Sequence, residues 1–265
     1  QTPTLLYIHN DPRTIRGIRK ATERAGCLEQ VSAVVCVSEC IKRCMLEGVE
    51  NHPHAVKVRV VLNGVDTASL TPSAQKRREI VFVGRLSPQK GGLLFAEAAL
   101  RIKDRLPGWR FVLVGARRFG KPTLGSDYER QVIAAMKRLG AQGEITGYLS
   151  HKEVLGRFKN AAIAVIPSQW DEPLGLVVLE AMSAGCAVVA SRRGGIPELI
   201  DDAGLLIDSG EAATWAEQVL HLAEDGQLQR QYQRAARARA VQSLDIHHTS
   251  AQLDAIRMEL MSSGK

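Results

Sequence analysis

Two glutamates flank the stretch of this sequence that is best suited to chemistry. Glu172 and Glu180 occur in E-P-L-G-L-V-V-L-E, with Pro173 and Gly175 between them. Pro173 ends any preceding element, and Gly175 lets a ligand approach the backbone closely. The residues that follow are apolar on every face, which predicts a buried helix over 174–184. A carboxylate on each side of a helix N-terminus therefore marks a candidate ligand site.

The two carboxylates meet different physical demands. Glu180 is the only charged residue of the predicted buried helix, where an unpaired carboxylate is costly. It must therefore meet a protein cation or the hydroxyl groups of a ligand. Glu172 lies just before the helix, where unpaired backbone N–H groups and the helix dipole favour an anion such as a phosphate. An N-terminal acid on a core helix, with Glu180 in a salt bridge, is the simpler alternative.

A second group of charged and small residues occurs at 80–92, I-V-F-V-G-R-L-S-P-Q-K-G-G. I-V-F-V predicts a buried strand that ends at Gly84, with Arg85 at its carboxyl end and Lys90 just before the next helix. Open α/β sheets bind ligands at this edge, so the two cations and the glycine-rich helix start predict a diphosphate site. The sequence has neither the dinucleotide fingerprint nor a P-loop. Two solvated surface cations are the alternative.

The ordered set of these motifs resembles a known family. G-R-L-x-x-x-K-G at 84–91, E-P-x-G-L-x-x-x-E at 172–180 and G-G-I-P-E at 194–198 are similar to the donor-binding half of retaining glycosyltransferases of family 4, which have the GT-B fold. N-G-V-D at 63–66 resembles the segment that enters that half. The similarity covers roughly residues 31–208. Four motifs in this order are much more specific than any one of them.

The resemblance implies a role for each charged residue of the motifs. Arg85 and Lys90 match the pair that binds the donor diphosphate. Glu180 matches the acid that holds the ribose hydroxyls of the nucleotide, and Glu172 matches the acid that contacts the donor sugar. These roles agree with a helix N-terminus that faces an anion.

Other residues match positions that act through their backbone or their place in the fold. Gly84 belongs to the donor-binding set, and Gly175 and Leu176 match positions whose N–H groups reach the phosphate and the sugar. Tyr148 lies where relatives bring backbone near the base, although its ring could serve only for packing. His9 follows a predicted strand at the edge of the interdomain cleft, where relatives often place a histidine near the reacting sugar. A loop histidine without a catalytic role is the alternative.

Strand and helix patterns alternate along the 265 residues, which predicts an α/β chain of the GT-B type. We expect a partial amino-terminal, acceptor-side domain at 1–66, with a basic helix over 13–26. A linker follows at 67–78, then a nucleotide-sugar donor-binding domain of the Rossmann type at 79–244. Residues 245–265 should form a helix that crosses back to the first domain. Since a whole Rossmann-like domain needs about 100–150 residues, the rest of the first domain should lie in a missing amino-terminal half or a separate subunit.

Composition narrows the partners. The net charge of +7 indicates an anionic partner, and the absence of nucleic-acid motifs with only 5% aromatic residues argues against nucleic acid. Five cysteines fit a reduced, cytoplasmic chain. Arg230, Arg234 and Arg237 share one face of a predicted helix, which could make peripheral contact with anionic lipid at the inner face of the membrane. A solvated charged face is the alternative.

The predicted reaction is transfer of a hexose from a nucleoside diphosphate sugar, with UDP as the favoured nucleotide, to a carbohydrate or lipid-linked acceptor. The family resemblance implies retention at the anomeric carbon and a role in cell-surface polysaccharide or glycolipid synthesis. No metal or other cofactor is expected. Arg117 stands where relatives commonly have a glycine near the nucleotide, which leaves the base open. The alternatives are a non-catalytic nucleotide-sugar-binding fragment, a nucleotide-sugar 2-epimerase, and a basic protein of nucleic-acid or membrane surfaces.

Overall fold

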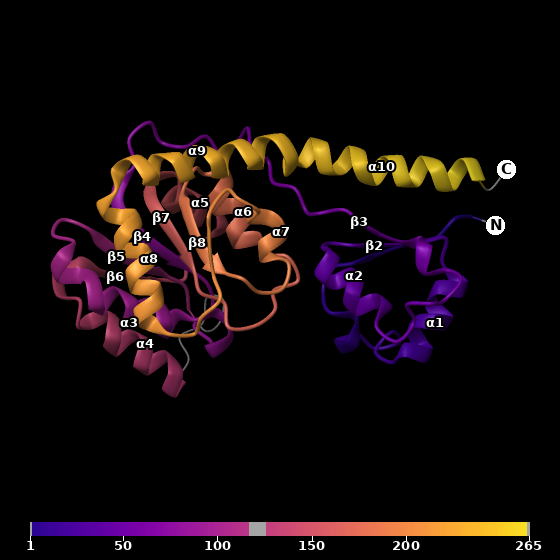
Figure 1. The fold of residues 1–265 in the computed structure, drawn as a ribbon, viewed down its shortest axis with the longest axis horizontal. Helices are drawn as coiled ribbons and strands as arrows, with labels where there is room; N and C mark the ends of the chain where they lie inside the picture. Colours follow the sequence, from indigo (N-terminus) through magenta and orange to yellow (C-terminus); the bar gives the residue numbers. More distant parts are fainter. Residues whose placement is uncertain (1, 117–125, 264–265) are drawn as a thin grey trace.

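The computed structural model describes residues 2–116 and 126–263, which form two parallel sheets (Figure 1). The smaller sheet has the strand order β1-β2-β3, and the larger has the order β6-β5-β4-β7-β8-β9. The strands are β1 (Leu5–Ile8), β2 (Ala33–Cys36), β3 (Val58–Val60), β4 (Arg77–Val83), β5 (Arg110–Val114), β6 (Gly143–Gly147), β7 (Ala161–Ile166), β8 (Ala187–Ser191) and β9 (Leu205–Ile207). We call the part around the smaller sheet the amino half and, after the role expected from the sequence, the part around the larger sheet the donor half.

Helices cover both faces of the larger sheet. One face packs against α3 (Gly92–Ile102), α4 (Asp127–Lys137) and α8 (Ala212–Glu224). The other face packs against α5 (His151–Asn160), α6 (Leu176–Ser183), α7 (Ile196–Ile200) and α9 (Gly226–Ser243). Since every strand pair is parallel and the central strands are buried on both faces, the predicted α/β fold is confirmed.

The amino half has α1 (Ala21–Gln30) and α2 (Glu39–Leu46) on one face of its sheet. The other face packs against α10 (Ile246–Ser263), where Ile256 is buried with Val35 and Val61. Arg59 of β3 forms an ion pair with Glu259 of α10. Figure 1 shows α10 leaving the donor half after α9 and running over the amino half. Of these two successive helices, α9 therefore packs on the donor half and α10 on the amino half.

The basic helix expected over 13–26 is wrong in its bounds. The structure has a single 3-10 turn at Pro12–Thr14, and α1 begins only at Ala21. Gly17 has a φ of +92°, in the left-handed region, which interrupts helical geometry. Arg24, in this segment, is buried and donates hydrogen bonds to the carbonyl oxygens of Arg19 and Glu47.

The prediction that Arg230, Arg234 and Arg237 share one exposed face is wrong for one of them. Arg230 and Arg234 of α9 are exposed, but Arg237 turns inward. Its guanidinium donates to the carbonyl oxygens of Thr67 and Ser183, at 2.9 and 2.6 Å. Arg237 therefore ties the segment before β4 to α6. None of the helices in the described ranges has the length and apolar character needed to span a bilayer.

Candidate functional site

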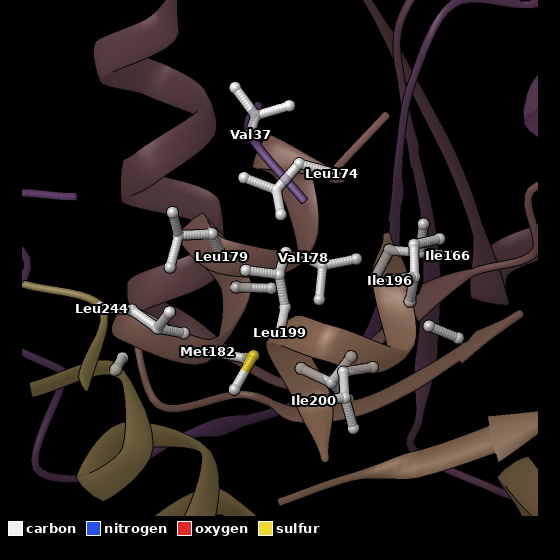
Figure 2. Close-up of a cluster of buried hydrophobic side chains, with 14 of the residues drawn as sticks. Val37, Ile166, Leu174, Val178, Leu179, Met182, Ile196, Leu199, Ile200 and Leu244 are labelled. Carbon is white, nitrogen blue, oxygen red and sulfur yellow. The ribbon is translucent and has the colours of Figure 1, made fainter. Parts of the chain in front are cut away.

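The N-terminus of α6 is held in place by its glycine cap and its apolar body. Gly175, the N-cap residue, has a φ of +101°, and a Cβ there would lie 3.1 Å from Ile196. Val178, Leu179 and Met182 pack in the buried cluster that Figure 2 shows. Because the first N–H groups of a helix lack acceptors within it, this end of α6 offers donors and positive potential to a ligand.

A cavity of about 400 Å³ lies in front of this helix end, between the two halves. Side chains of both halves line it. The amino half contributes His9, Asn10, Val37 and Asn63, and the donor half contributes Arg85, Lys90, Ile166, Trp170 and residues 172–178. The structure therefore brings together Glu172, Arg85, Lys90, His9, Gly175 and Leu176, which the sequence placed in one site.

Glu172 and Lys90 form a partly buried ion pair at the wall of this cavity. Lys90 Nζ lies 2.5 Å from Glu172 Oε1, and Ser168 Oγ donates to the same oxygen at 2.8 Å. Glu172 is only 7% exposed, and Lys90 Nζ also lies 5.2 Å from the centre of the Trp170 ring. These contacts restrict the side-chain rotamers of both residues, so the ammonium group of Lys90 is already positioned at the cavity before a ligand binds.

Close backbone packing brings the ion pair together. Gly91 has a φ of +74°, and a Cβ there would lie 1.9 Å from the carbonyl oxygen of Pro167. The turn that carries Lys90 (Pro88–Lys90) is thereby pressed against the loop that carries Ser168 and Glu172. Gly91 is thus required by geometry at this point.

Arg85 differs from Lys90 in its surroundings. Its side chain is exposed and has no hydrogen bond or ion pair with another residue of the described ranges. It also lines a second cavity of about 260 Å³, which is mostly apolar and includes Gly84, Tyr148, Leu149 and Val177. A guanidinium between an apolar hollow and a helix N-terminus is suited to a diphosphate whose attached ring enters the hollow.

Glu180 lines neither cavity. It lies three residues after Val177, which lines both, and so projects from a similar face of α6. Its carboxylate is 2.9 Å from Nε2 of His151, at the start of α5. Burial raises the pKa of Glu180, and the hydrogen bond to His151 opposes that rise. The carboxylate keeps 18% of its side chain exposed, which leaves room for a ligand hydroxyl.

Sequence reasoning did not single out Ser168, Trp170, Asn10, Asn63 or His151 as site residues. Ser168 and Trp170 are close to Glu172 in the sequence, so this proximity could have identified them as candidate site residues. His151 reaches Glu180 only because α5 packs on α6, and no local pattern shows that. In the part of the chain that the structure describes, no three acidic, histidine or cysteine residues gather as a metal site requires. The loop containing Arg117 lies outside the described residues.

Comparison with known proteins places this site in a family. The description Glycosyl transferases group 1 matches residues 70–239 of the chain, which contain every motif of the donor half. The chain belongs to the glycosyl transferases group 1 family. Among curated proteins, it is 30% identical over 200 residues to a glycogen synthase of Mycobacterium tuberculosis, covering 73% of this chain and 46% of that protein.

Two further similarities agree with this family. The chain is 26% identical over 225 residues to the lipopolysaccharide 1,2-N-acetylglucosaminetransferase of Salmonella typhimurium, covering 76% of this chain and 58% of that enzyme. The crystal structure of Anabaena HepE in complex with UDP superimposes with a TM-score of 0.82 at 23% identity, over 98% of this chain and 72% of that one. The likeness to HepE shows the fold, and the expected GT-B architecture of group 1 glycosyl transferases is confirmed. The chain thus spans only part of the length of these relatives.

Proposed function

We propose that the protein is a glycosyltransferase that moves a sugar from a nucleoside diphosphate sugar to an acceptor hydroxyl, with retention of anomeric configuration. One observation carries the proposal. The N-terminus of α6, Arg85 and Lys90 all face one cavity, and both halves line it. Such a cavity can hold a donor on one side and an acceptor on the other.

The departing diphosphate is the group that needs stabilisation. Negative charge develops on it as the bond to the sugar breaks, and fixed positive groups lower the energy of that state. Arg85 supplies a guanidinium, Lys90 an ammonium held by Glu172, and Gly175 and Leu176 the start of α6. Because these groups are positioned before the reaction, little reorganisation is needed as charge develops.

Glu172 is assigned to orient the donor sugar. Its Oε1 is occupied by Lys90 and Ser168, whereas Oε2 accepts no hydrogen bond from another described residue. Oε2 can therefore accept from a sugar hydroxyl. We do not assign Glu172 as a covalent nucleophile. In the proposed retaining path the acceptor attacks from the face that the phosphate leaves, and a phosphate oxygen takes the acceptor proton. His9 lines the amino-half side of the cavity, and we assign it to a position near the reacting sugar.

Nucleotide recognition is assigned to Glu180 and the apolar hollow. Glu180 would accept from the ribose hydroxyls, and the hollow beside Gly84 and Tyr148 would hold the base. UDP is the favoured nucleotide, and the fold shared with HepE, solved with UDP, supports this choice. The similarity to a lipopolysaccharide glycosyltransferase supports a carbohydrate or lipid-linked acceptor of cell-surface synthesis, reached from the cytoplasmic side.

Calorimetric titration of the chain with UDP, GDP and ADP, beside Glu180→Ala, tests this proposal. We expect saturable binding of UDP that is at least about tenfold weaker in the variant, because a hydrogen bond to a charged group is lost. A chain that is folded by circular dichroism and binds none of the three nucleotides would contradict it.

A non-catalytic binding module is the second candidate, because the amino half of this chain contains a sheet of only three strands among the described residues. It would bind UDP in the same titration. Hydrolysis or transfer of the sugar from a UDP-sugar by the longest natural form of the protein separates the two.

A further inference from the structure

Glu198, the last residue of G-G-I-P-E, makes a contact that has no part in the proposed binding of the donor. It lies on α7 of the donor half, but its carboxylate reaches the amino half. Oε2 accepts from the backbone N–H of Glu39 at 2.7 Å, and Oε1 accepts from that of Cys40 at 2.9 Å. These are the first two N–H groups of α2. One carboxylate therefore joins segments that are 159 positions apart in sequence.

The start of α2 is where such a carboxylate is most favourable. The first N–H groups of a helix have no acceptors within it, and the helix dipole places positive potential there. Ser38, the N-cap residue, accepts from the N–H of Ile41 at 3.1 Å. Ser38 and Glu198 together therefore satisfy the N–H groups of Glu39, Cys40 and Ile41. The N-terminus of α2 is completed by a residue from the other half of the molecule.

The backbone of the two halves is also closely packed around this contact. Ser38 is fully buried, and its Oγ donates to the carbonyl oxygen of Pro173 at 2.5 Å. A Cβ on Gly195 would lie 3.0 Å from the Cβ of Ser38 and 2.6 Å from the Pro173 oxygen. Beside them, Val37 and Leu174 share the buried cluster drawn in Figure 2. The loop before α2 thus rests on the loop that carries the site.

The carboxylate is presented from a fixed element. Arg239 of α9 donates to the carbonyl oxygens of Glu198 and Leu199, at 2.7 and 2.5 Å. These bonds hold α7 against α9. If α2 moved away from the donor half, Glu198 could move with it only by breaking the hydrogen bonds to Arg239. Separation of the halves at this point requires both N–H···carboxylate bonds to break.

We propose that Glu198 is a positioning residue that clasps the N-terminus of α2 and thereby sets the spacing of the two halves across the cavity. The clasp joins the loop of Pro173, next to Glu172 and Gly175, to the amino half that carries His9. The contact itself is independent of any donor, and its consequence for transfer rests on the proposed function.

Hydrogen exchange at single-residue resolution tests the clasp directly. Protection of the Glu39 and Cys40 amides cannot come from α2 itself, so it reports the bond to Glu198. Glu198→Gln keeps the size of the side chain but turns an amide NH₂ toward one of the two N–H groups. We expect exchange at both amides to rise about tenfold or more, and the radius of gyration from X-ray scattering to increase. Glu217→Gln, an exposed site on α8, removes the same charge and should change neither quantity.

Nucleotide affinity separates positioning from general destabilisation. Glu198 does not line the donor cavities, so Glu198→Gln should leave the Kd for UDP unchanged. Ser38→Ala, which removes the bond to Pro173, should also increase the radius of gyration at unchanged UDP affinity. Equal exchange at Glu39 and Cys40 in wild type and Glu198→Gln, or a loss of UDP affinity parallel to a fall in thermal stability, would overturn the clasp. Failure of the wild-type chain to bind UDP would overturn only the proposed function. The contact between Glu198 and α2 would still be tested by hydrogen exchange at Glu39 and Cys40, which does not depend on UDP.

Discussion

Arg85 and Lys90 bring the same charge to one cavity, but among the residues that the structure describes only Lys90 has an ion-pair partner. Lys90 is bound to Glu172, whereas Arg85 is exposed without such a bond to a described residue. We therefore expect Arg85→Ala to weaken UDP binding by about 1.5–3 kcal/mol, roughly tenfold to a hundredfold, with uridine affinity and the thermal midpoint unchanged. Calorimetric titration with UDP and uridine measures this. Equal losses for the two ligands would contradict a role at the diphosphate.

Lys90→Ala should have a second effect that Arg85→Ala lacks. Removing the ammonium leaves the Glu172 carboxylate, only 7% exposed, with Ser168 as its remaining partner among the described side chains. We expect a loss of about 1–3 kcal/mol in the free energy of unfolding, together with weaker UDP binding. Urea denaturation gives the first quantity. The double variant Lys90→Ala with Glu172→Gln is the control and should recover part of the stability, because it removes the unpaired charge.

Glu180 is expected to serve binding at the expense of stability. Burial raises its pKa in the folded state above the unfolded value. The stability associated with such a group is fully present below the unfolded pKa and is lost as pH rises through the folded pKa. At pH 7 the ionised carboxylate is therefore destabilising. Glu180→Gln should raise the thermal midpoint at pH 7 while it weakens UDP binding about tenfold.

Thermal midpoints measured from about pH 7 down to pH 4 check the sign of this linkage. The advantage of Glu180→Gln over wild type should shrink as the pH falls and Glu180 becomes protonated. A midpoint for the variant below that of wild type at pH 7 would show that the bond to His151 outweighs the cost of burial.

At the scale of elements, the contact between two loops depends on Gly91. Its φ is +74°, and a Cβ at this position would lie 1.9 Å from the Pro167 oxygen, so no side chain fits. We expect Gly91→Ala to destabilise the fold by about 2 kcal/mol or more. Gly156, inside α5 with open space around its Cβ position, is the matched control. Gly156→Ala should stabilise by about 0.5–1 kcal/mol. Urea denaturation of both variants decides, and similar changes in the two would contradict this account.

The elements of the donor half were predictable because their signals are local. The apolar runs of β4, β7 and α6 are long and are followed by Gly84, Pro167 and Gly185, so their types and approximate ends follow from the sequence. The helix over 13–26 failed because Gly17 was compatible with a helix pattern although its backbone is left-handed. α7 was missed because a five-residue helix, with Gly195 as its N-cap residue and Pro197 in its first turn, has too little periodicity to detect.

Some contacts of the candidate site could likewise be predicted from local sequence patterns, and others could not. Arg85 and Lys90 lie at a strand end and a helix start, and Glu172 lies just before α6, so motif spacing was sufficient to bring them to one edge of the sheet. The partners of Glu180 and Glu198 could not be predicted, because His151 and the start of α2 reach them only through packing of distant segments.

At the scale of the whole molecule, α10 provides the second layer of the amino half. Ile256 is 8% exposed and packs with Val35 and Val61, whereas Met258 is 69% exposed. We expect Ile256→Ala to cost about 2–4 kcal/mol of amino-half stability, and Met258→Ala less than about 0.5 kcal/mol. Hydrogen exchange of the β2 amides measures the local effect. Equal protection of β2 in the two variants would show that α10 is not part of this core.

The position of α10 also has a consequence for synthesis of the chain. Arg59 meets Glu259 only after 200 further residues have been added, and Ile256 arrives at nearly the same time. At a translation rate of about 5–20 residues per second, the face of β2 that carries Val35 waits at least about ten seconds for its cover. Among the described residues, those of α9 belong to the buried clusters of the donor half and those of α10 do not. The donor half, which is synthesised second, can therefore finish folding first. The amino half, which is synthesised first, stays exposed to chaperones and proteases until α10 has been made.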